Sequence, residues 1–439
     1  MSASPQATSP LAGLATALTG LPGGPAWAEW RRSALERLLA AGLPTPRDEP
    51  WKYVNTRLLG RRDLAPAPPR PLSADALAAA PAPAALFPRF VFVDGRFNAA
   101  LSHPLGSGEL QLSRFGERLE ASTPGSLALP LAGDPQEVDE RIRTLNACLA
   151  ADGPVIVVPA GSCIATHLHV VHLATGGGAY PRTQIIVGAG SALNVVETHL
   201  SLGDAEAFVA AATDIRLGES ANLTHTSLQI HGARSVLFDD VAVSVAANAR
   251  YEHRLAALGG QLGRVDLRVA LEAPGARAEL AGLIFADGGR EQHVRTLVEH
   301  RAGRTQSDQL YRGVAAERGR GSYDGRVVVH PGAAKTESRQ SSRNLLLGRD
   351  AAFESRPQLE INADDVKCSH GATTGTLDEQ MLFYLLTRGL ERDTAKALLT
   401  YAFVRDVLRR VHPAAVERAA EQRVLGRLPA AELLKEFVA

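Results

Sequence analysis

Short apolar runs alternate with turn residues through the middle of the chain, from about residue 151 to 375. Valine, isoleucine and leucine dominate these runs, and glycine, asparagine and aspartate separate them. Apolar segments of this length between turn residues predict β-strands. The clearest examples are residues 155–158, 185–187, 236–245, 265–271 and 327–329.

The predicted strands recur at a nearly constant interval. A small-residue turn followed by a strand is found at Ala192, Ala221, Ala249 and Ala276, with spacings of 29, 28 and 27 residues. Constant spacing without helical periodicity indicates a β-solenoid, in which each coil buries its inner face only by stacking on its neighbours. A β-sandwich with regular hairpins gives similar strand spacing, so both architectures stay open at this point.

The flanking regions have a different pattern. Residues 1–150 are mixed, with a helix predicted over 25–41 by apolar residues at helical spacing and a second over 135–149. Between them, residues 65–88 are rich in proline and alanine and predict a linker. We therefore expect an α-rich N-terminal region before a β domain over 151–375.

Residues 376–439 predict a small helical bundle. Thr376-Leu377-Asp378-Glu379 has the pattern of a capping box at a helix start, and Gly389 is a plausible C-cap. Amphipathic segments predict further helices over about 393–411, 414–425 and 430–438. An apolar face with Leu398, Tyr401 and Leu408 fits internal packing or partner binding.

Composition removes several classes of function. Lys+Arg and Asp+Glu are both 47 among 439 residues, so the chain lacks the basic character of a nucleic-acid-binding protein. Its three cysteines exclude a disulfide framework, a Cys₄ zinc site and a cluster with four cysteines from one chain. Residues 1–25 lack a basic signal-peptide start, and their apolar run is too short to span a membrane. We expect a soluble cytoplasmic protein.

Two groups of residues are candidates for metal chemistry. His167 and His169 share one face of a strand and have the residue types that chelate zinc or iron, whereas His172 falls on the other face. Cys368 and His370 also share a face if extended, and a thiolate beside an imidazole suits iron or zinc. Without a metal, His167 and His169 would be solvated histidines on the surface of the sheet. Cys368 would be a buried cysteine that only packs, with His370 incidental to it.

The chain lacks an evident catalytic motif of its own. The dipeptide Gly-Lys does not occur, so the chain has no P-loop, and neither G-x-S-x-G nor H-E-x-x-H is present. Two enzymes stay open as alternatives: a β-helical enzyme acting on polysaccharide, and a metal-dependent enzyme that uses His167 and His169. The low aromatic content, 5%, argues against the first.

Several segments together resemble the SufB/SufD family. The match is densest over 338–390 and includes Cys368-Ser369-His370-Gly371-Ala372-Thr373. In SufB-type sequences a glutamate generally follows this histidine, whereas Gly371 follows it here, so the chain is similar to the SufD-type paralogue. The other matching segments are 48–53, 145–147, 152–161, 338–347, 357–361, 378–380, 383–385 and 388–389.

The resemblance implies a right-handed parallel β-helix flanked by helical N-terminal and C-terminal regions. It implies a non-catalytic scaffold subunit of the SUF iron–sulfur cluster assembly complex, paired with a SufB-like paralogue and bound to a SufC-like ABC-type ATPase. A transient nascent cluster would be shared with SufB at Cys368 and His370, ATP would act only through SufC, and residues 376–439 would dock that ATPase. Homodimerisation in isolation and the role of His167, His169 and His172 stay open.

Overall fold

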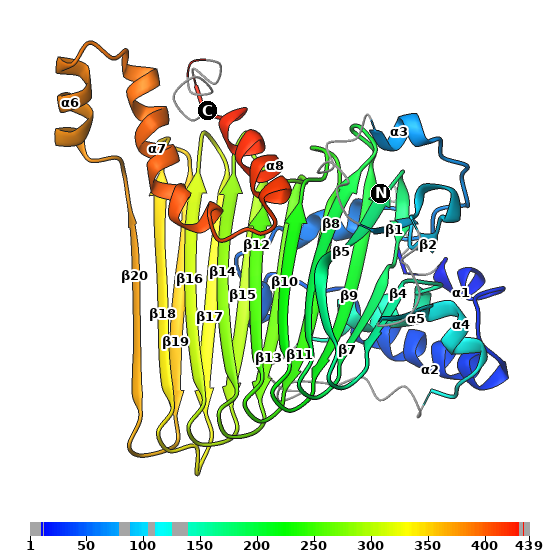
Figure 1. Ribbon diagram of the computed structural model, residues 1–439. Coiled ribbons are helices and arrows are strands. Elements are labelled where there is room, and N and C mark those ends of the chain that lie inside the picture. The colour runs from blue at the N-terminus through cyan, green and yellow to red at the C-terminus, as the bar shows by residue number, and fades with distance from the viewer. Residues whose placement is uncertain are drawn as a thin grey trace, which may run out of the picture.

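Two sheets face each other along the length of the molecule in the computed structural model (Figure 1). It describes residues 10–11, 13–78, 88–103, 110–124, 139–429 and 433. The first sheet contains β1 (Arg89–Val93), β2 (Arg96–Phe97), β5 (Cys163–Ala174), β8 (Ala192–Ser201), β10 (Asn222–Gln229), β12 (Arg250–Ala257), β14 (Arg277–Ala286), β16 (Gln306–Ala315), β18 (Glu337–Leu346) and β20 (Lys367–Gly375). The second contains β3 (Gln111–Arg114), β4 (Pro154–Val158), β6 (Gly177–Ala179), β7 (Arg182–Val187), β9 (Ala207–Leu217), β11 (Val236–Val245), β13 (Leu262–Leu271), β15 (Glu291–His300), β17 (Arg320–Val329) and β19 (Ala352–Ile361).

Successive coils stack in register, which confirms the predicted β-solenoid. Asn222 pairs with Arg250, and Arg250 with Arg277, so one coil takes 28 and then 27 residues. From β4 and β5 onward the neighbouring strands of each sheet run parallel, which excludes a sandwich of antiparallel hairpins. Ala221, Ala249 and Ala276 are fully buried just before their strands, as the repeat predicts. In the preceding coil that position belongs to Ser191 and not to Ala192, because Asn222 pairs with Ala192.

The helices lie at the two ends and on the outer faces of the solenoid. Figure 1 shows α1, α2, α4 and α5 at one end, with α6 beyond the end of β20 at the other. The predicted helix over 25–41 is confirmed as α2, and α7 and α8 match the predictions closely. The helices are α1 (Leu14–Ala17), α2 (Pro25–Ala41), α3 (Ala74–Ala78), α4 (Phe115–Glu120), α5 (Arg141–Leu149), α6 (Glu379–Thr387), α7 (Arg392–Leu408) and α8 (Ala414–Leu425), with short 3₁₀ turns η1 (Glu49–Trp51), η2 (Thr56–Arg61) and η3 (Ala99–Leu101).

Other parts of the flanking regions differ from their sequence patterns. The helix predicted over 135–149 is confirmed over 141–149 as α5; residues 139–140 are not helical, and residues 135–138 lie outside the described residues. Residues 79–87 of the predicted linker lie outside them too, as does the predicted helix over 430–438 apart from Leu433. The N-terminal region also contributes β1, β2 and β3 to the sheets, a contribution that its mixed pattern did not predict.

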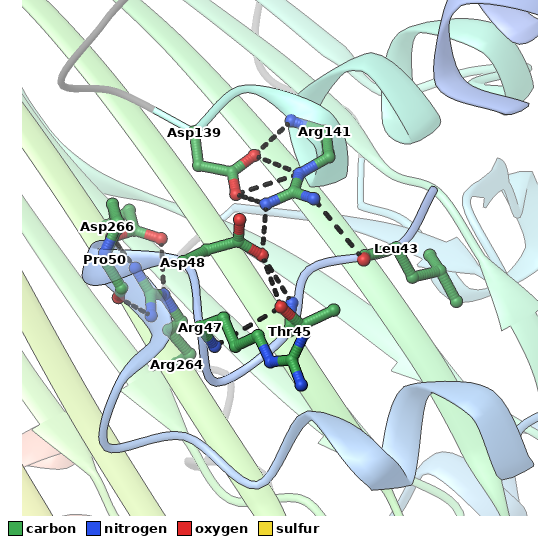
Figure 2. Close-up of polar contacts among 9 residues, drawn as sticks. All are labelled: Leu43, Thr45, Arg47, Asp48, Pro50, Asp139, Arg141, Arg264 and Asp266. Carbon is green, nitrogen blue, oxygen red and sulfur yellow. Dashed lines mark hydrogen bonds and ion pairs between the residues drawn. The ribbon is translucent and has the colours of Figure 1, made fainter. Parts of the chain in front are cut away.

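The segment around Asp48 fastens the N-terminal region to the second sheet (Figure 2). The Asp48 carboxylate forms an ion pair with the guanidinium of Arg141, with 2.8 Å between the nitrogen and oxygen atoms, and this contact connects the segment to α5. The Pro50 carbonyl oxygen accepts a hydrogen bond of 2.6 Å from Arg264 of β13. The Arg264 guanidinium also lies 4.0 Å from the ring centroid of Trp51, which is buried. The segment 48–53, one of those that resemble the family, therefore holds the N-terminal region against the second sheet.

Gly153 marks the entry into the solenoid and tolerates no side chain. A Cβ placed on it would lie 1.8 Å from the carbonyl oxygen of Arg182, on the neighbouring strand β7. We expect Gly153→Ala to lower the free energy of unfolding by roughly 3 kcal/mol, because the backbone itself must move. Urea unfolding of the full chain measures this loss. Gly60→Ala is the control, since a Cβ there meets nothing within 4 Å, and equal stability of the two variants would contradict the expectation.

Candidate functional site

The last strand of the first sheet, β20, carries both predicted ligands. Among the described residues it pairs with β18 on one side only, and its register places Ser338 beside Cys368 and Gln340 beside His370. Along β20 every described residue is exposed or half-buried. The strand therefore presents an open backbone edge, next to a face that the following coil would cover if the solenoid continued.

Cys368 lies at the boundary between the core and the surface. Its side chain is half-buried and packs against the apolar core between the sheets. Burial raises the pKa of the Cys368 thiol, and a hydrogen bond with the backbone of Ser338 opposes that shift. A thiol with a raised pKa is mainly protonated at neutral pH, so binding a metal here must displace a proton.

His370 is exposed and lies two residues beyond Cys368 on the same strand. Residues i and i+2 of a strand point to one face with their Cα atoms about 6.6 Å apart. The structure thus places Cys368 and His370 on a common face, as the sequence predicts. They can ligate one metal centre together, or two neighbouring atoms of a cluster.

A polar groove of about 450 Å³ runs past Cys368 over the outer side of the last coils. Inside the solenoid, a chain of hydrogen bonds lies next to this groove. The His300 ring is 2.9 Å from the Ser307 hydroxyl, which in turn is 2.8 Å from the Ser338 hydroxyl. The surroundings of Cys368 therefore combine the apolar core between the sheets with these polar groups. The groove residues are Arg277, Ala278, Glu279, Gln306, Ser307, Asp308, Glu337, Ser338, Arg339, Lys367, Cys368 and Ser369.

Cys368 and His370 have no third ligand from this chain within the part that the structure describes. One group of three or more metal-ligating side chains occurs among the described residues, and it consists of His172, Glu197 and His199, inside the solenoid on β5 and β8. Two ligands cannot complete a metal or cluster site, so a site at Cys368 and His370 would need further ligands from another chain.

The histidines of β5 divide between the two faces, as their spacing predicts. His169 lies on the outer face with its Nε2 atom 2.9 Å from the hydroxyl of Thr198, and burial lowers its pKa to about 3. His167 shares that face and is half-buried. His172 points into the interior, where it meets Glu197 at 3.0 Å. The proposed pair of His167 and His169 is not part of the group that could hold a metal.

Sequence reasoning missed the polar interior next to His172. Glu197 is buried between His172 and His225, which lie 3.0 and 2.8 Å from its carboxylate oxygens. These contacts hold the pKa of Glu197 well below its usual range, against the opposing effect of burial. Glu197 and His199 have the same parity as the core residues Leu193 and Val195 of their strand, so strand periodicity could have placed them on the inner face.

The C-terminal helices form a second candidate surface. Asp378, and not Thr376, caps α6, because its carboxylate accepts hydrogen bonds from the backbone of Gln380 and Met381. Beyond this cap Met381, Phe383 and Tyr384 are 58, 67 and 56% exposed. An apolar cluster of this kind on a projecting helix is typical of a protein-binding surface.

Helix α7 packs on the solenoid instead of facing outward. Tyr401 and Leu408 are buried in an apolar cluster that includes Phe285 of β14 and Val314 of β16, which confirms internal packing of this face. Asp406 also pairs with Arg312 of β16 at 2.7 Å. A displacement of the C-terminal helices would therefore act directly on these strands.

No helix in the described part of the chain combines the length and the apolar character needed to cross a membrane.

Comparison with known proteins gives consistent matches over nearly the whole chain. Residues 170–403 match the family described as SUF system FeS cluster assembly, SufBD core domain. The iron–sulfur cluster assembly protein SufD of Escherichia coli is 30% identical over 404 residues, which cover 90% of this chain and 92% of that protein. The SufBD family protein slr0076 of Synechocystis is 27% identical, over 90% of this chain and 89% of its own length. Protein ABCI7, chloroplastic, of Arabidopsis thaliana is 27% identical, over 91% and 85% respectively.

Proposed function

The chain belongs to the SufB/SufD family of the SUF system, and we propose that it is a non-catalytic scaffold subunit that pairs with a SufB-type paralogue and binds a SufC-type ATPase. Family membership supports a role in iron–sulfur cluster assembly. The observation that carries the finer proposal is the free edge of β20 among the described residues, on the strand that contains Cys368 and His370.

The SufB-type partner would pair along the open end of the solenoid. An unpaired strand edge offers a row of backbone donors and acceptors to another chain. The nine residues of β20 supply such a row, and their exposed side chains leave the adjoining face accessible. A paralogue built on the same solenoid has a matching edge, so the two ends can complement each other.

The nascent cluster would lie at this junction. Cys368 would supply a thiolate and His370 an imidazole, and the SufB-type chain would supply the remaining ligands. The cluster is cargo that leaves the complex, so a site with ligands from two chains can open when the chains move apart.

The ATPase would bind the exposed apolar cluster on α6. Because α7 packs on β14 and β16, movement of the bound ATPase would reach the solenoid through these contacts. The chain has no P-loop, so ATP hydrolysis would be the partner's contribution.

Co-purification tests the proposal. The tagged chain, co-expressed with the SufB-type and SufC-type proteins of the same organism, should retain both. Phe383→Asp should lower retention of the ATPase tenfold or more, since truncation of a central aromatic residue is among the costliest changes in an interface. It should leave the SufB-type protein bound, because Phe383 lies on α6 and not on β20.

Leu39→Asp is the matched control, since Leu39 is an exposed apolar residue of α2, 43% accessible, at the other end of the molecule. Retention of neither partner by the unmodified chain would refute the scaffold proposal. Full ATPase retention by Phe383→Asp would refute the role of α6 alone.

A further inference from the structure

We infer that His172, Glu197 and His199 form a second metal site, inside the solenoid, which binds one divalent transition-metal ion such as iron(II) or zinc(II). This site goes beyond the proposed function, because it lies wholly within one chain and needs no partner.

The backbone register brings the three residues together. His172 of β5 pairs directly with His199 of β8, and their rings stack with centroids 4.8 Å apart. Glu197 precedes His199 by two residues and points to the same interior face. One ligand atom of each residue lies within 4.8 Å of the others.

Two imidazoles and one carboxylate are a ligand set that suits zinc(II) and iron(II). Ligand atoms about 2.1 Å from a tetrahedral ion lie roughly 3.4 Å apart, so small side-chain rotations close the remaining distance. All three residues are at least 95% buried, which shields the site from competing water.

His199 is the observation that points to a ligand. It is 1% exposed, and neither of its ring nitrogens makes a hydrogen bond. The Asp239 carboxyl group lies 3.9 Å from its Nε2 atom, beyond hydrogen-bond distance. Buried polar groups without hydrogen bonds are uncommon.

Glu197 is held in position by residues around the site. Thr183 and Thr213 donate hydrogen bonds of 2.7 and 3.2 Å to its two carboxylate oxygens. His225 contacts the Oε2 atom at 2.8 Å. Supporting contacts of this kind orient the ligands of metal sites. A purely hydrogen-bonded core would satisfy Glu197 in the same way, but it leaves His199 unexplained.

Metal content of the purified full-length chain tests the inference. Cells are grown in minimal medium supplemented with either iron or zinc, and bound metal is measured by inductively coupled plasma mass spectrometry. We expect about one equivalent of iron or zinc in at least one medium, and the mass spectrum identifies the ion. His199→Gln and Glu197→Gln should each lower the content tenfold or more.

His300→Gln is the matched control, because His300 is a buried interior histidine whose two ring nitrogens already bond to Thr305 and Ser307. It should keep the full equivalent. Absence of metal from the unmodified chain, or full metal content in His199→Gln, would overturn the inference. If the two variants do not fold, anomalous scattering from crystals of the unmodified chain decides, since a peak must lie between His172, Glu197 and His199.

Discussion

Replacing both Cys368 and His370 by alanine should reduce cluster formation by roughly 10–100-fold in a complex reconstituted with the SufB-type and SufC-type partners. The variant loses both of its ligands, and the partner's ligands alone cannot complete the site. Absorbance of the reconstituted cluster, quantified with iron and sulfide content, measures the loss.

The same double variant should keep its fold and its ATPase. His370 is exposed and Cys368 is half-buried at the end of the core, so neither change opens a large cavity. Cys163→Ala is the control, because Cys163 is an exposed thiol on β5, far from β20 in the order of the first sheet. Normal cluster yield in the double variant would show that the site assignment is wrong.

Lowering the pH from 7.5 to 5 should destabilise the chain by several kcal/mol. Burial lowers the pKa of His169 and of His231 to about 3 and that of His300 to about 4. Their ordinary value, near 6.5, applies in the unfolded chain. Between about pH 4 and 6.5 the unfolded state therefore binds more protons, and stability falls as the pH falls.

Each of these histidines contributes up to about 1.4 kcal/mol per pH unit in that window. Asp239 acts in the opposite direction, because burial raises the pKa of its carboxyl group and the folded state then binds the extra proton. Urea unfolding at pH 7.5, 6 and 5 measures the net slope. His300→Gln should make the slope shallower by about 1.4 kcal/mol per unit at most, and stability that is unchanged down to pH 5 would contradict the explanation.

The local pattern of the chain was enough to predict much of the architecture. Short apolar runs between turn residues predicted the strands, and within a strand the face of a residue depends only on the parity of its position. The same parity placed Cys368 and His370 on one face and separated His172 from His169. The helices α2, α7 and α8 followed from apolar periodicity in the same way.

Helix ends and interior contacts were harder to predict. Thr376 and Asp378 are both suitable N-cap residues for α6. In the structure Asp378 is the cap, because its carboxylate accepts hydrogen bonds from the free backbone N–H groups at the helix start. The pairing of His172 with His199 depends on the length of an intervening coil, which local periodicity does not specify.

By itself the sequence determined the strand faces, the repeat length and the absence of a P-loop, because each of these depends only on residues that are adjacent or evenly spaced along the chain. Only the tertiary structure decided that β20 ends the sheet with an open edge and that Glu197 is enclosed by His172 and His225. The reason is that stacking brings residues some 25 to 30 positions apart into contact, and the register of each coil is set by the packing of all the others.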